Sequence, residues 1–392
     1  MKPDYNGGSI VNLMSSIAKA LGTKTKYKTL RILPPEQIKA KNTVLIIIDG
    51  LGYNYIMAKC KGTVFQEHLK GKMTSVFPAT TSSAITTFAT GEGPQQHAII
   101  GWFMLLKEIG IVCTTLRFTT RAGKTPLSTM GVKIKDIFEI ESFSKKLNCK
   151  SYAIKPKEIM NSEYSKLAFN KSKMIGYTTL NGFFKQITKT IKSDTRKKYI
   201  YAYWPQFDAL CHKKGVENKK TEKHFRELDA GIRKFLRKIE NTNTQVIITA
   251  DHGLVDTKTI QLENHPKLKS CLTMPLCGDG RSKHCYVHPS KTKEFKKYVK
   301  TKLGKYCELH NSSEMIKQKY FGLGKTNPKL KDRIGDYMLI MKKKYAMDDS
   351  IIGTKKSINI GHHGGESEDE MIVPLIVISM KKLRTKKVTK NS

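Results

Sequence analysis

"TVLIIID", residues 43–49, is the stretch that decides the fold class. Five large aliphatic residues follow one another without a polar alternation, which is typical of a short strand buried on both faces in a parallel sheet. The run stops at Asp49, and Gly50 follows. In open α/β sheets ligands bind at the carboxyl ends of the strands. Asp49 is therefore the first candidate functional residue.

Three further apolar runs have the same character. They are KYIYAYWPQFD (198–208), TQVIITADHG (244–253) and MIVPLIVISM (371–380). Amphipathic helical patterns separate the runs, which predicts an α/β fold with helices on both faces of one sheet. Pro374 in the last run predicts an edge strand or an early break, because proline cannot donate a hydrogen bond to a neighbouring strand.

Acidic residues and histidines recur where these runs end. Asp208 and His212 are spaced D-x-x-x-H, which places both on one face of a helical turn. The remaining candidates follow strand ends or lie in glycine-rich loops: Asp49, Asp251, His252, His362 and His363. Aspartate and histidine are ligands for zinc and similar divalent metals. The set predicts a metal site at the carboxyl edge of the sheet.

A run of hydroxyl side chains, VFPATTSSAITTFATG (76–91), has two interpretations. Residues 82–90 look helical, so Thr80 or Thr81 could be an N-cap, with Ser82 and Ser83 as solvated residues of the first turn. Alternatively, one hydroxyl is a nucleophile that a metal activates. The metal-type ligands elsewhere in the chain favour the second interpretation.

The motifs IIIDGLG, FPATTSSAITTFATG, D-x-x-x-H, ADHG and HHGG, in this order, resemble those of the alkaline phosphatase superfamily. Within it, they are most similar to the type I phosphodiesterase/nucleotide pyrophosphatase family, in a prokaryotic subgroup. The resemblance implies a three-layer α/β/α sandwich. It also implies one metal held by Asp208, His212 and His363, and a second held by Asp49, Asp251 and His252. The implied nucleophile, which also bridges toward both metals, is Thr81, with Thr80 as the alternative if the register shifts by one.

This resemblance predicts a metal-dependent hydrolase of phosphodiester or pyrophosphate bonds. Two divalent ions, zinc first and manganese or magnesium as alternatives, would lower the pKa of the threonine hydroxyl and lead to a phospho-threonine intermediate. Residues 82–85 lack the aromatic residue and the asparagine of the nucleotide-specific members. A phosphomonoesterase or phosphonate hydrolase of the same superfamily is therefore the alternative.

Three further residues have two interpretations each. Arg281 could contact a substrate phosphate or anchor neighbouring loops. Tyr203 could shape the leaving-group side of the site or pack within its strand. His362, beside His363, could support a ligand or face solvent.

The predicted domain organisation has three parts. Residues 1–255 plus 351–382 form the catalytic core, residues 256–350 form a smaller α+β insertion that acts as a lid or substrate wall, and residues 383–392 form a basic disordered tail. The insertion is expected because short strands and basic helices follow the ADHG motif.

The formal net charge of +38 raises the question of partners. The excess is carried mainly by dispersed lysine, so we expect a small phosphorylated substrate, nucleotides included, and we favour this over a non-catalytic nucleic-acid-binding protein. The eight cysteines form no CxxC pair, no run is long enough to span a membrane, and no secretory signal is evident. These features predict a cytoplasmic protein.

Overall fold

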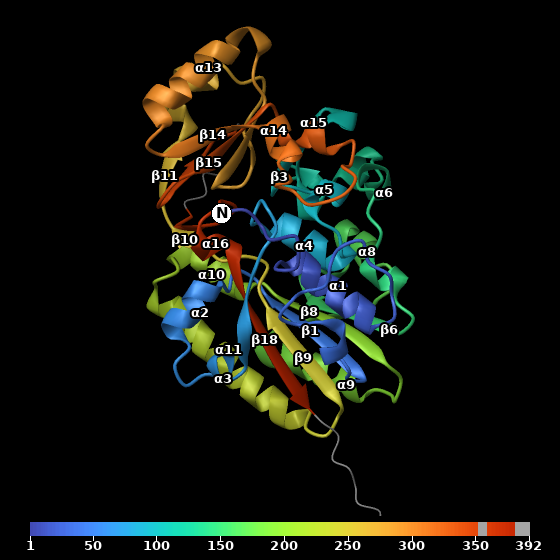
Figure 1. The fold of residues 1–392 in the computed structure, drawn as a ribbon. Helices are drawn as coiled ribbons and strands as arrows, with labels where there is room; N and C mark the ends of the chain where they lie inside the picture. Colours follow the sequence, from blue (N-terminus) through green and yellow to red (C-terminus); the bar gives the residue numbers. More distant parts are fainter. Residues whose placement is uncertain (352–358, 381–392) are drawn as a thin grey trace, which may run out of the picture.

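A computed structural model describes residues 1–351 and 359–380 of the chain (Figure 1). The predicted basic tail at 383–392 lies outside these described residues, as do residues 352–358 and 381–382 of the predicted core. The fold is the expected α/β architecture, with helices on both faces of a central sheet.

The central sheet has seven strands in the order β2-β18-β9-β1-β8-β6-β7. The strand bounds are β1 Asn42–Ile48, β2 Leu69–Thr74, β6 Lys150–Pro156, β7 Lys173–Tyr177, β8 Lys198–Trp204, β9 Thr244–Thr249 and β18 Ile372–Met380. β1 pairs in parallel with β8 and β9, and all its residues are buried, as the unbroken apolar run predicts. Because β1, β8 and β9 are parallel neighbours, their carboxyl ends meet at one edge of the sheet.

β18 is an interior strand, so the prediction of an edge strand was wrong for the strand as a whole. Its first part pairs antiparallel with β2 and its second part pairs antiparallel with β9, with an irregularity between Leu375 and Ile376. Pro374 lies in the first part, where β9 is not yet paired. The proline is therefore tolerated because the strand has a neighbour on only one side at that level.

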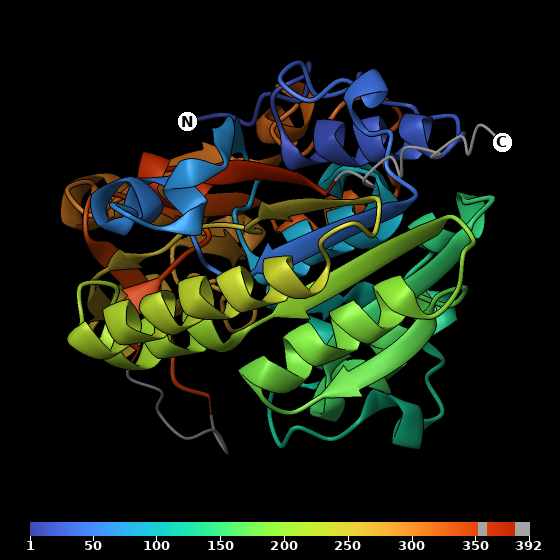
Figure 2. The ribbon, with the colours of Figure 1, turned by 90° about the horizontal axis from the view of Figure 1, so that it is seen from below.

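Helices cover both faces of this sheet, as Figure 2 shows for α9 and α11 on one face and α1 on the other. α4 packs on α1, so the hydroxyl run lies on the α1 face. The helix bounds in this unit are α1 Ile10–Ala20, α2 Tyr53–Lys59, α3 Val64–Glu67, α4 Thr81–Thr90, α5 Pro94–His97, α6 Ile134–Ile137, α7 Lys157–Met160, α8 Glu163–Ala168, α9 Leu180–Lys192, α10 Gln206–Lys214, α11 Lys219–Lys238 and α16 Glu368–Met371.

A second seven-stranded sheet has antiparallel neighbours in the order β14-β15-β13-β12-β3-β4-β5. Its strands are β3 Phe103–Leu106, β4 Ile111–Thr114, β5 Thr119–Thr120, β12 Cys277–Gly278, β13 Ser282–Cys285, β14 Cys307–Asn311 and β15 Tyr337–Met341. Residues 103–120 thus share a sheet with the predicted insertion, and the expected boundary at residue 256 does not coincide with the edge of this sheet. The division into domains stays a prediction.

The second sheet has its own apolar core, which includes Phe295 of α13 and Leu339 of β15. Two short pairs, β10 with β17 and β11 with β16, join the two sheets. The remaining bounds are β10 Val255–Asp256, β11 Lys258–Gln261, β16 Tyr345–Asp348, β17 Gly361–His362, α12 Pro266–Lys269, α13 Thr292–Tyr298, α14 Ser312–Lys317 and α15 Leu330–Ile334. Within residues 1–351 and 359–380, no helix combines the length and the apolar character needed to cross a membrane.

Candidate active site

The structure brings all six predicted metal ligands together at the carboxyl edge of the central sheet. Their ligand atoms form two groups in which every atom lies within 4.8 Å of the others. We call Asp49, Asp251 and His252 the inner cluster, and Asp208, His212 and His363 the outer cluster. The chain reaches them from β1, β9, α10 and the loop after β17.

The inner cluster is held by backbone hydrogen bonds at the strand ends. Oδ1 of Asp251 accepts hydrogen bonds from the N–H groups of Gly50 and His252, both at 3.0 Å. The Tyr203 hydroxyl donates to Oδ2 of Asp49. Gly50 has φ +75°, and a Cβ there would lie 3.0 Å from Cβ of Asp208. The glycine after Asp49 is thus required for the turn and for the close approach of α10.

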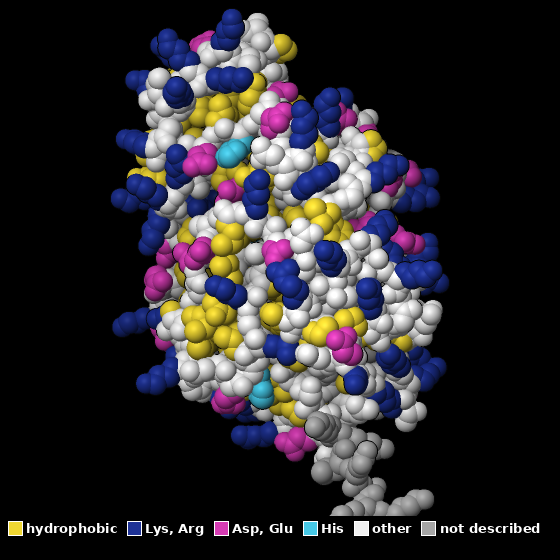
Figure 3. Space-filling model, in the orientation of Figure 1, with side chains coloured by type: hydrophobic (Ala, Val, Ile, Leu, Met, Phe, Trp, Pro, Cys, Tyr) yellow, Lys and Arg dark blue, Asp and Glu magenta, His cyan; other side chains and the backbone are white. Residues whose placement is uncertain are grey.

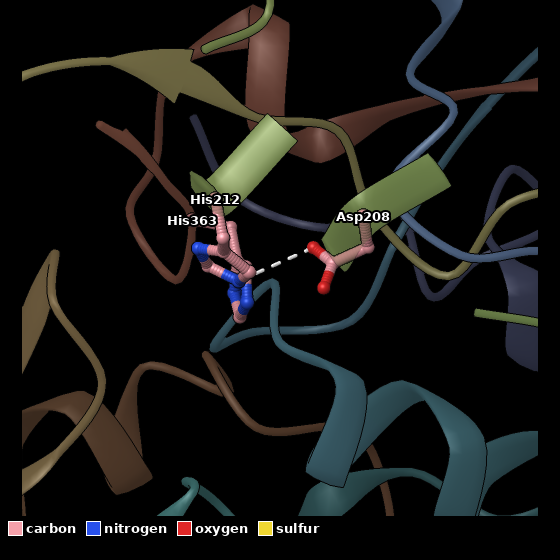
Figure 4. Close-up of side chains that lie close together, drawn as sticks. All are labelled: Asp208, His212 and His363. Carbon is pink, nitrogen blue, oxygen red and sulfur yellow. Dashed lines mark ion pairs between the residues drawn. The ribbon is translucent and has the colours of Figure 1, made fainter. Parts of the chain in front are cut away.

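The outer cluster is built on one turn of α10 and one loop (Figure 4). His212 Nε2 lies 3.3 Å from Oδ1 of Asp208, one helical turn earlier. His212 Nδ1 lies 2.7 Å from the Gly361 carbonyl oxygen, which can only accept, so Nδ1 donates to it and Nε2 faces Asp208. The His363 ring is stacked on His252, with ring centroids 3.9 Å apart, and therefore joins the two clusters.

The donor atoms of both clusters fit divalent metal ions. Oδ1 of Asp49, Oδ2 of Asp251, Oδ1 of Asp208 and Nδ1 of His363 are all buried and have no hydrogen-bond partner. Such buried polar atoms are nearly always paired in native proteins. Carboxylate oxygens and neutral imidazole nitrogens are also the donors that zinc accepts.

The pKa shifts of the cluster residues also favour bound metal ions. Burial, with the neighbouring charges of Asp251 and Asp208, raises the pKa of Asp49 well above its ordinary value. Burial and the nearby rings of His252 and His212 lower the pKa of His363 well below its ordinary value. Three carboxylates in so small a volume need a cation to be ionised together, and a neutral histidine is the form that ligates metal.

Thr81 is the first residue of α4 and lies beside the inner cluster. Its Oγ1 is 3.1 Å from Nε2 of His252. Thr80 occupies the N-cap position, but its hydroxyl donates to Oδ1 of Asp279 at 2.8 Å and makes no cap hydrogen bond. The first-turn N–H groups of α4 are consequently left without a side-chain cap. Ser82 and Ser83 are fully buried, which contradicts the less favoured interpretation of them as solvated residues of the first turn.

A cavity of about 560 Å³ opens onto Thr81 and the outer cluster. The inner cluster does not line it. Much of the cavity wall comes from the second sheet and its loops, and the residues there that carry charge or an aromatic ring include Trp102, Arg117, Arg121, Lys124, Asp279 and Lys283. Sequence reasoning missed all of these. For Asp279 a weak signal existed, because it stands between two glycines in GDGR beside Arg281.

Contacts distinguish between the two interpretations for two of the three residues, Arg281 and His362. Arg281 is buried, donates to backbone carbonyls including that of Lys343 at 2.9 Å, and pairs with Glu370 at 2.8 Å. It is an anchor between loops. His362 is buried rather than solvent-facing, and its Nδ1 lies 2.8 Å from the Thr257 hydroxyl oxygen.

A mostly parallel central sheet, with acids and histidines gathered at its carboxyl edge and a threonine at a helix N-terminus beside them, is the arrangement that the resemblance to the alkaline phosphatase superfamily leads us to expect. The family model for type I phosphodiesterase/nucleotide pyrophosphatase matches residues 43–366, and the chain belongs to this family. Its class is therefore a metal-dependent phosphoryl hydrolase.

Solved structures share this fold. Murine ectonucleotide pyrophosphatase/phosphodiesterase 5 is similar with a TM-score of 0.64 and 14% identity, over 85% of this chain and 87% of the other. Phosphonoacetate hydrolase from Sinorhizobium meliloti 1021, in complex with phosphonoformate, is similar with a TM-score of 0.63 and 15% identity, over 87% and 89%. At these identities the likeness establishes the fold alone. No curated protein has significant sequence similarity to the chain.

Proposed function

We propose that the protein hydrolyses phosphodiester or pyrophosphate bonds, with Thr81 as the nucleophile between two divalent metal ions. The inner cluster would hold one ion and the outer cluster the other. Small phosphorylated compounds, nucleotides included, would be the substrates.

The observation that carries this proposal is the position of Thr81. Its hydroxyl lies 3.1 Å from a ligand atom of the inner cluster, at the start of a helix and in the wall of the cavity. A further argument comes from a related structure. Murine ectonucleotide pyrophosphatase/phosphodiesterase 5 is described in complex with AMP as an inactive variant with a threonine-to-alanine change.

The residues of this chain divide the work of the reaction. Thr81 Oγ1 loses its proton to solvent and attacks phosphorus, an O–P bond to Thr81 forms, and the bond to the leaving oxygen breaks; the leaving oxygen keeps the electron pair of that bond and takes up a proton from solvent. Water then attacks the phosphoryl-threonine, the Thr81 O–P bond breaks, and Thr81 regains a proton. A phosphoryl group on Thr81 would lie at the N-terminus of α4, where the first-turn N–H groups, which have no side-chain cap, would stabilise its charge.

When bound, the two divalent ions would supply a lower pKa for the threonine hydroxyl and positive charge beside the attacking and leaving oxygens. The carboxylates of Asp49, Asp208 and Asp251 would hold them, with His212, His252 and His363 completing the sets. The backbone hydrogen bonds to Asp251 and the Tyr203 hydroxyl on Asp49 fix the orientation of those carboxylates.

A phosphonate hydrolase or phosphomonoesterase is the second candidate function. It is favoured by the comparable similarity to phosphonoacetate hydrolase, and by the small residues at 82–85. Metal sites and nucleophile would be the same, so the two candidates differ only in the substrate that the outer part of the cavity accepts.

A non-catalytic role in nucleic-acid binding is the least favoured reading. On the face drawn in Figure 3, lysine and arginine side chains are scattered among acidic and apolar ones and form no continuous basic stripe. Dispersed charge of this kind raises the field around the protein without forming a phosphate-tracking groove.

The test is hydrolysis of bis(p-nitrophenyl) phosphate by metal-loaded protein, with Thr81→Ala, Thr81→Ser and Thr80→Ala as matched variants. We expect Thr81→Ala to lower kcat by on the order of 10³-fold or more, because the nucleophile is lost. Thr81→Ser keeps a hydroxyl and should retain far more activity. Unchanged turnover in Thr81→Ala would contradict the role assigned to Thr81. A loss of kcat in Thr80→Ala larger than that in Thr81→Ala would identify Thr80 as the nucleophile instead.

A further inference from the structure

The part of the cavity wall that the second sheet contributes contains a buried lysine whose position the proposed reaction does not explain. Lys283 lies on β13 and is 2% exposed, yet it lines the cavity. Lysine is almost never this buried unless its ammonium group is paired. The nearest paired carboxylate oxygen is Oδ1 of Asp348 at 3.9 Å, which is beyond hydrogen-bond distance.

Two other lysines are equally buried in the described part of the chain, and they show what an internally satisfied lysine looks like. Lys155 donates to the Ser165 hydroxyl at 2.7 Å, and Lys198 donates to the carbonyl oxygens of Ile191 and Asp194 at 2.9 and 2.6 Å. Neither lines the cavity. Among the described residues, none accepts a hydrogen bond from Nζ of Lys283. This ammonium group is therefore the one of the three that is available to a ligand.

The charges around Lys283 leave an excess of cations on this side of the cavity. Arg121 is neutralised by Asp349, with which it forms a buried ion pair. Arg117 and Lys124 also line the cavity, and the described residues offer them no ion pair or hydrogen bond. Asp348 and Asp279 are the remaining carboxylates on this wall, and Asp279 is already bonded to the Thr80 hydroxyl and to the Trp102 N–H group.

We propose that Lys283, with Arg117 and Lys124 at the rim, forms a cationic subsite for a second anionic group of the substrate. The substrate is then a phosphoryl compound with a further phosphate or carboxylate beyond the scissile phosphorus, such as a pyrophosphate or a phosphonocarboxylate. This inference rests on the proposed function for the scissile group, which the metal clusters and Thr81 bind. It adds the class of substrate, since a simple uncharged ester group would leave Lys283 with only the 3.9 Å ion pair to Asp348 and no hydrogen bond.

The first experiment measures binding, so that it does not depend on turnover. Metal-loaded wild type and Lys283→Gln are titrated in a calorimeter with orthophosphate, which has one anionic group, and with pyrophosphate and phosphonoacetate, which have two. We expect Lys283→Gln to weaken one or both of the two-group ligands by about 10- to 100-fold, as expected for the loss of a charge-assisted hydrogen bond. The loss for orthophosphate should be at least tenfold smaller. A loss of affinity for pyrophosphate identifies the second group as a phosphate, and a loss for phosphonoacetate identifies it as a carboxylate.

Three variants make the result interpretable. Lys293→Gln on the exposed face of α13 removes the same charge away from the cavity and should leave all three affinities unchanged. Lys283→Arg should keep a preference for the two-group ligands if the charge is what matters. Arg117 is exposed, so its replacement does not disturb core packing. Arg117→Gln should weaken the binding of the same two-group ligands by about 3- to 10-fold.

Equal losses for all three ligands, or no loss for any, would overturn the subsite. The second experiment separates this outcome from failure of the proposed function. Hydrolysis of pyrophosphate and of bis(p-nitrophenyl) phosphate by wild type tests catalysis, and Lys283→Gln should lower kcat/KM mainly through KM, with at least a tenfold greater loss for pyrophosphate. A wild type that binds pyrophosphate through Lys283 but hydrolyses neither compound would reject the catalytic proposal and retain the subsite.

Discussion

The inner and outer clusters contain the same kinds of donor atoms but differ in their access to solvent. The side chains of Asp49, Asp251 and His252 are at most 3% exposed. In the outer cluster, His212 is 24% exposed and Asp208 is 14% exposed, and both line the cavity. The inner cluster is fixed by backbone N–H groups at strand ends, whereas the outer one depends on a helix turn and a loop.

This difference suggests a division of labour. Thr81 contacts the inner cluster through His252, so the inner metal is expected to activate the nucleophile and to stay in place. The outer cluster meets the cavity, so its metal is expected to face the leaving group or the water and to exchange with solvent. The following predictions test this comparison, from the largest expected effect to the smallest.

Substitution within the inner cluster should have the largest effect on catalysis. Asp251→Asn removes a carboxylate charge beside the nucleophile and should lower kcat by on the order of 10³-fold, since a catalytic metal contributes several kcal/mol. His212→Asn in the outer cluster should cost less and should be partly rescued by excess zinc. The measurement is kcat for bis(p-nitrophenyl) phosphate over a zinc titration. If excess zinc fully rescued Asp251→Asn while His212→Asn stayed inactive, the roles given to the inner and outer metals would have to be exchanged.

The two clusters should lose their metal to a chelator at different rates. With a chelator in excess, metal should leave in two phases, and the faster phase should be at least about tenfold faster because the outer ligands are accessible. The rates are followed by a zinc-sensitive dye as the chelator acts. In His212→Asn the fast phase should disappear and the slow one should remain. A single phase in wild type would show that the difference in burial has no kinetic consequence.

The hydrogen bond between Thr80 and Asp279 should have an intermediate effect, since it holds the residue before the nucleophile. Thr80→Val preserves shape and removes the bond, and Asp279→Asn removes the charge. Each should lower kcat by about 10- to 100-fold, in line with a charged hydrogen bond of about 1.5 to 3 kcal/mol. The double variant should lose little more than either single one, because both remove the same contact. Additive losses would mean that the two residues act separately.

The smallest effect concerns pH and stability without metal. Burial raises the pKa of Asp49 and Asp251, so the folded metal-free protein binds protons that the unfolded chain has already released. Stability must then fall as pH rises from the ordinary carboxyl pKa of about 4 through the raised folded pKa values, so we expect a lower Tm at pH 8 than at pH 7. Histidines with a lowered pKa, such as His97 at about 3, oppose this trend only below about pH 6.5.

Asp49→Asn should remove most of that pH dependence, since an amide does not titrate. The measurement is thermal unfolding of the chelated protein at both pH values. A Tm of the metal-free wild type that rises between pH 7 and pH 8 would contradict the role given to these carboxylates.

The sequence was sufficient to predict the central sheet and the clustering of the six ligand-type residues. Each of those residues follows an apolar run, or stands in a glycine-rich turn, and parallel strands bring such ends to one edge. The local signal and the tertiary arrangement therefore agree, as they do for Asp49 after β1 and Asp251 after β9. Thr81 was predicted differently: the hydroxyl run alone left two interpretations open, and only the family resemblance pointed to Thr81, with Thr80 as the alternative.

The cavity wall could not be predicted in this way. Lys283 and Asp279 lie on or beside strands of two to four residues, which are too short to show a period. Their neighbours on the wall, Arg117 and Lys124, come from a segment more than 150 residues earlier, joined to them only by the second sheet. In a chain with 71 lysine and arginine residues, no pattern distinguishes one functional lysine from the dispersed ones.

The central claim is that this edge of the sheet holds two divalent ions. The most direct measurement is the number of zinc ions per chain, determined by elemental analysis after metal-free protein is equilibrated with zinc and dialysed. The account predicts close to two for wild type and close to zero for the double variant Asp208→Asn/Asp251→Asn. One ion or none in wild type, or an unchanged number in the double variant, would contradict it.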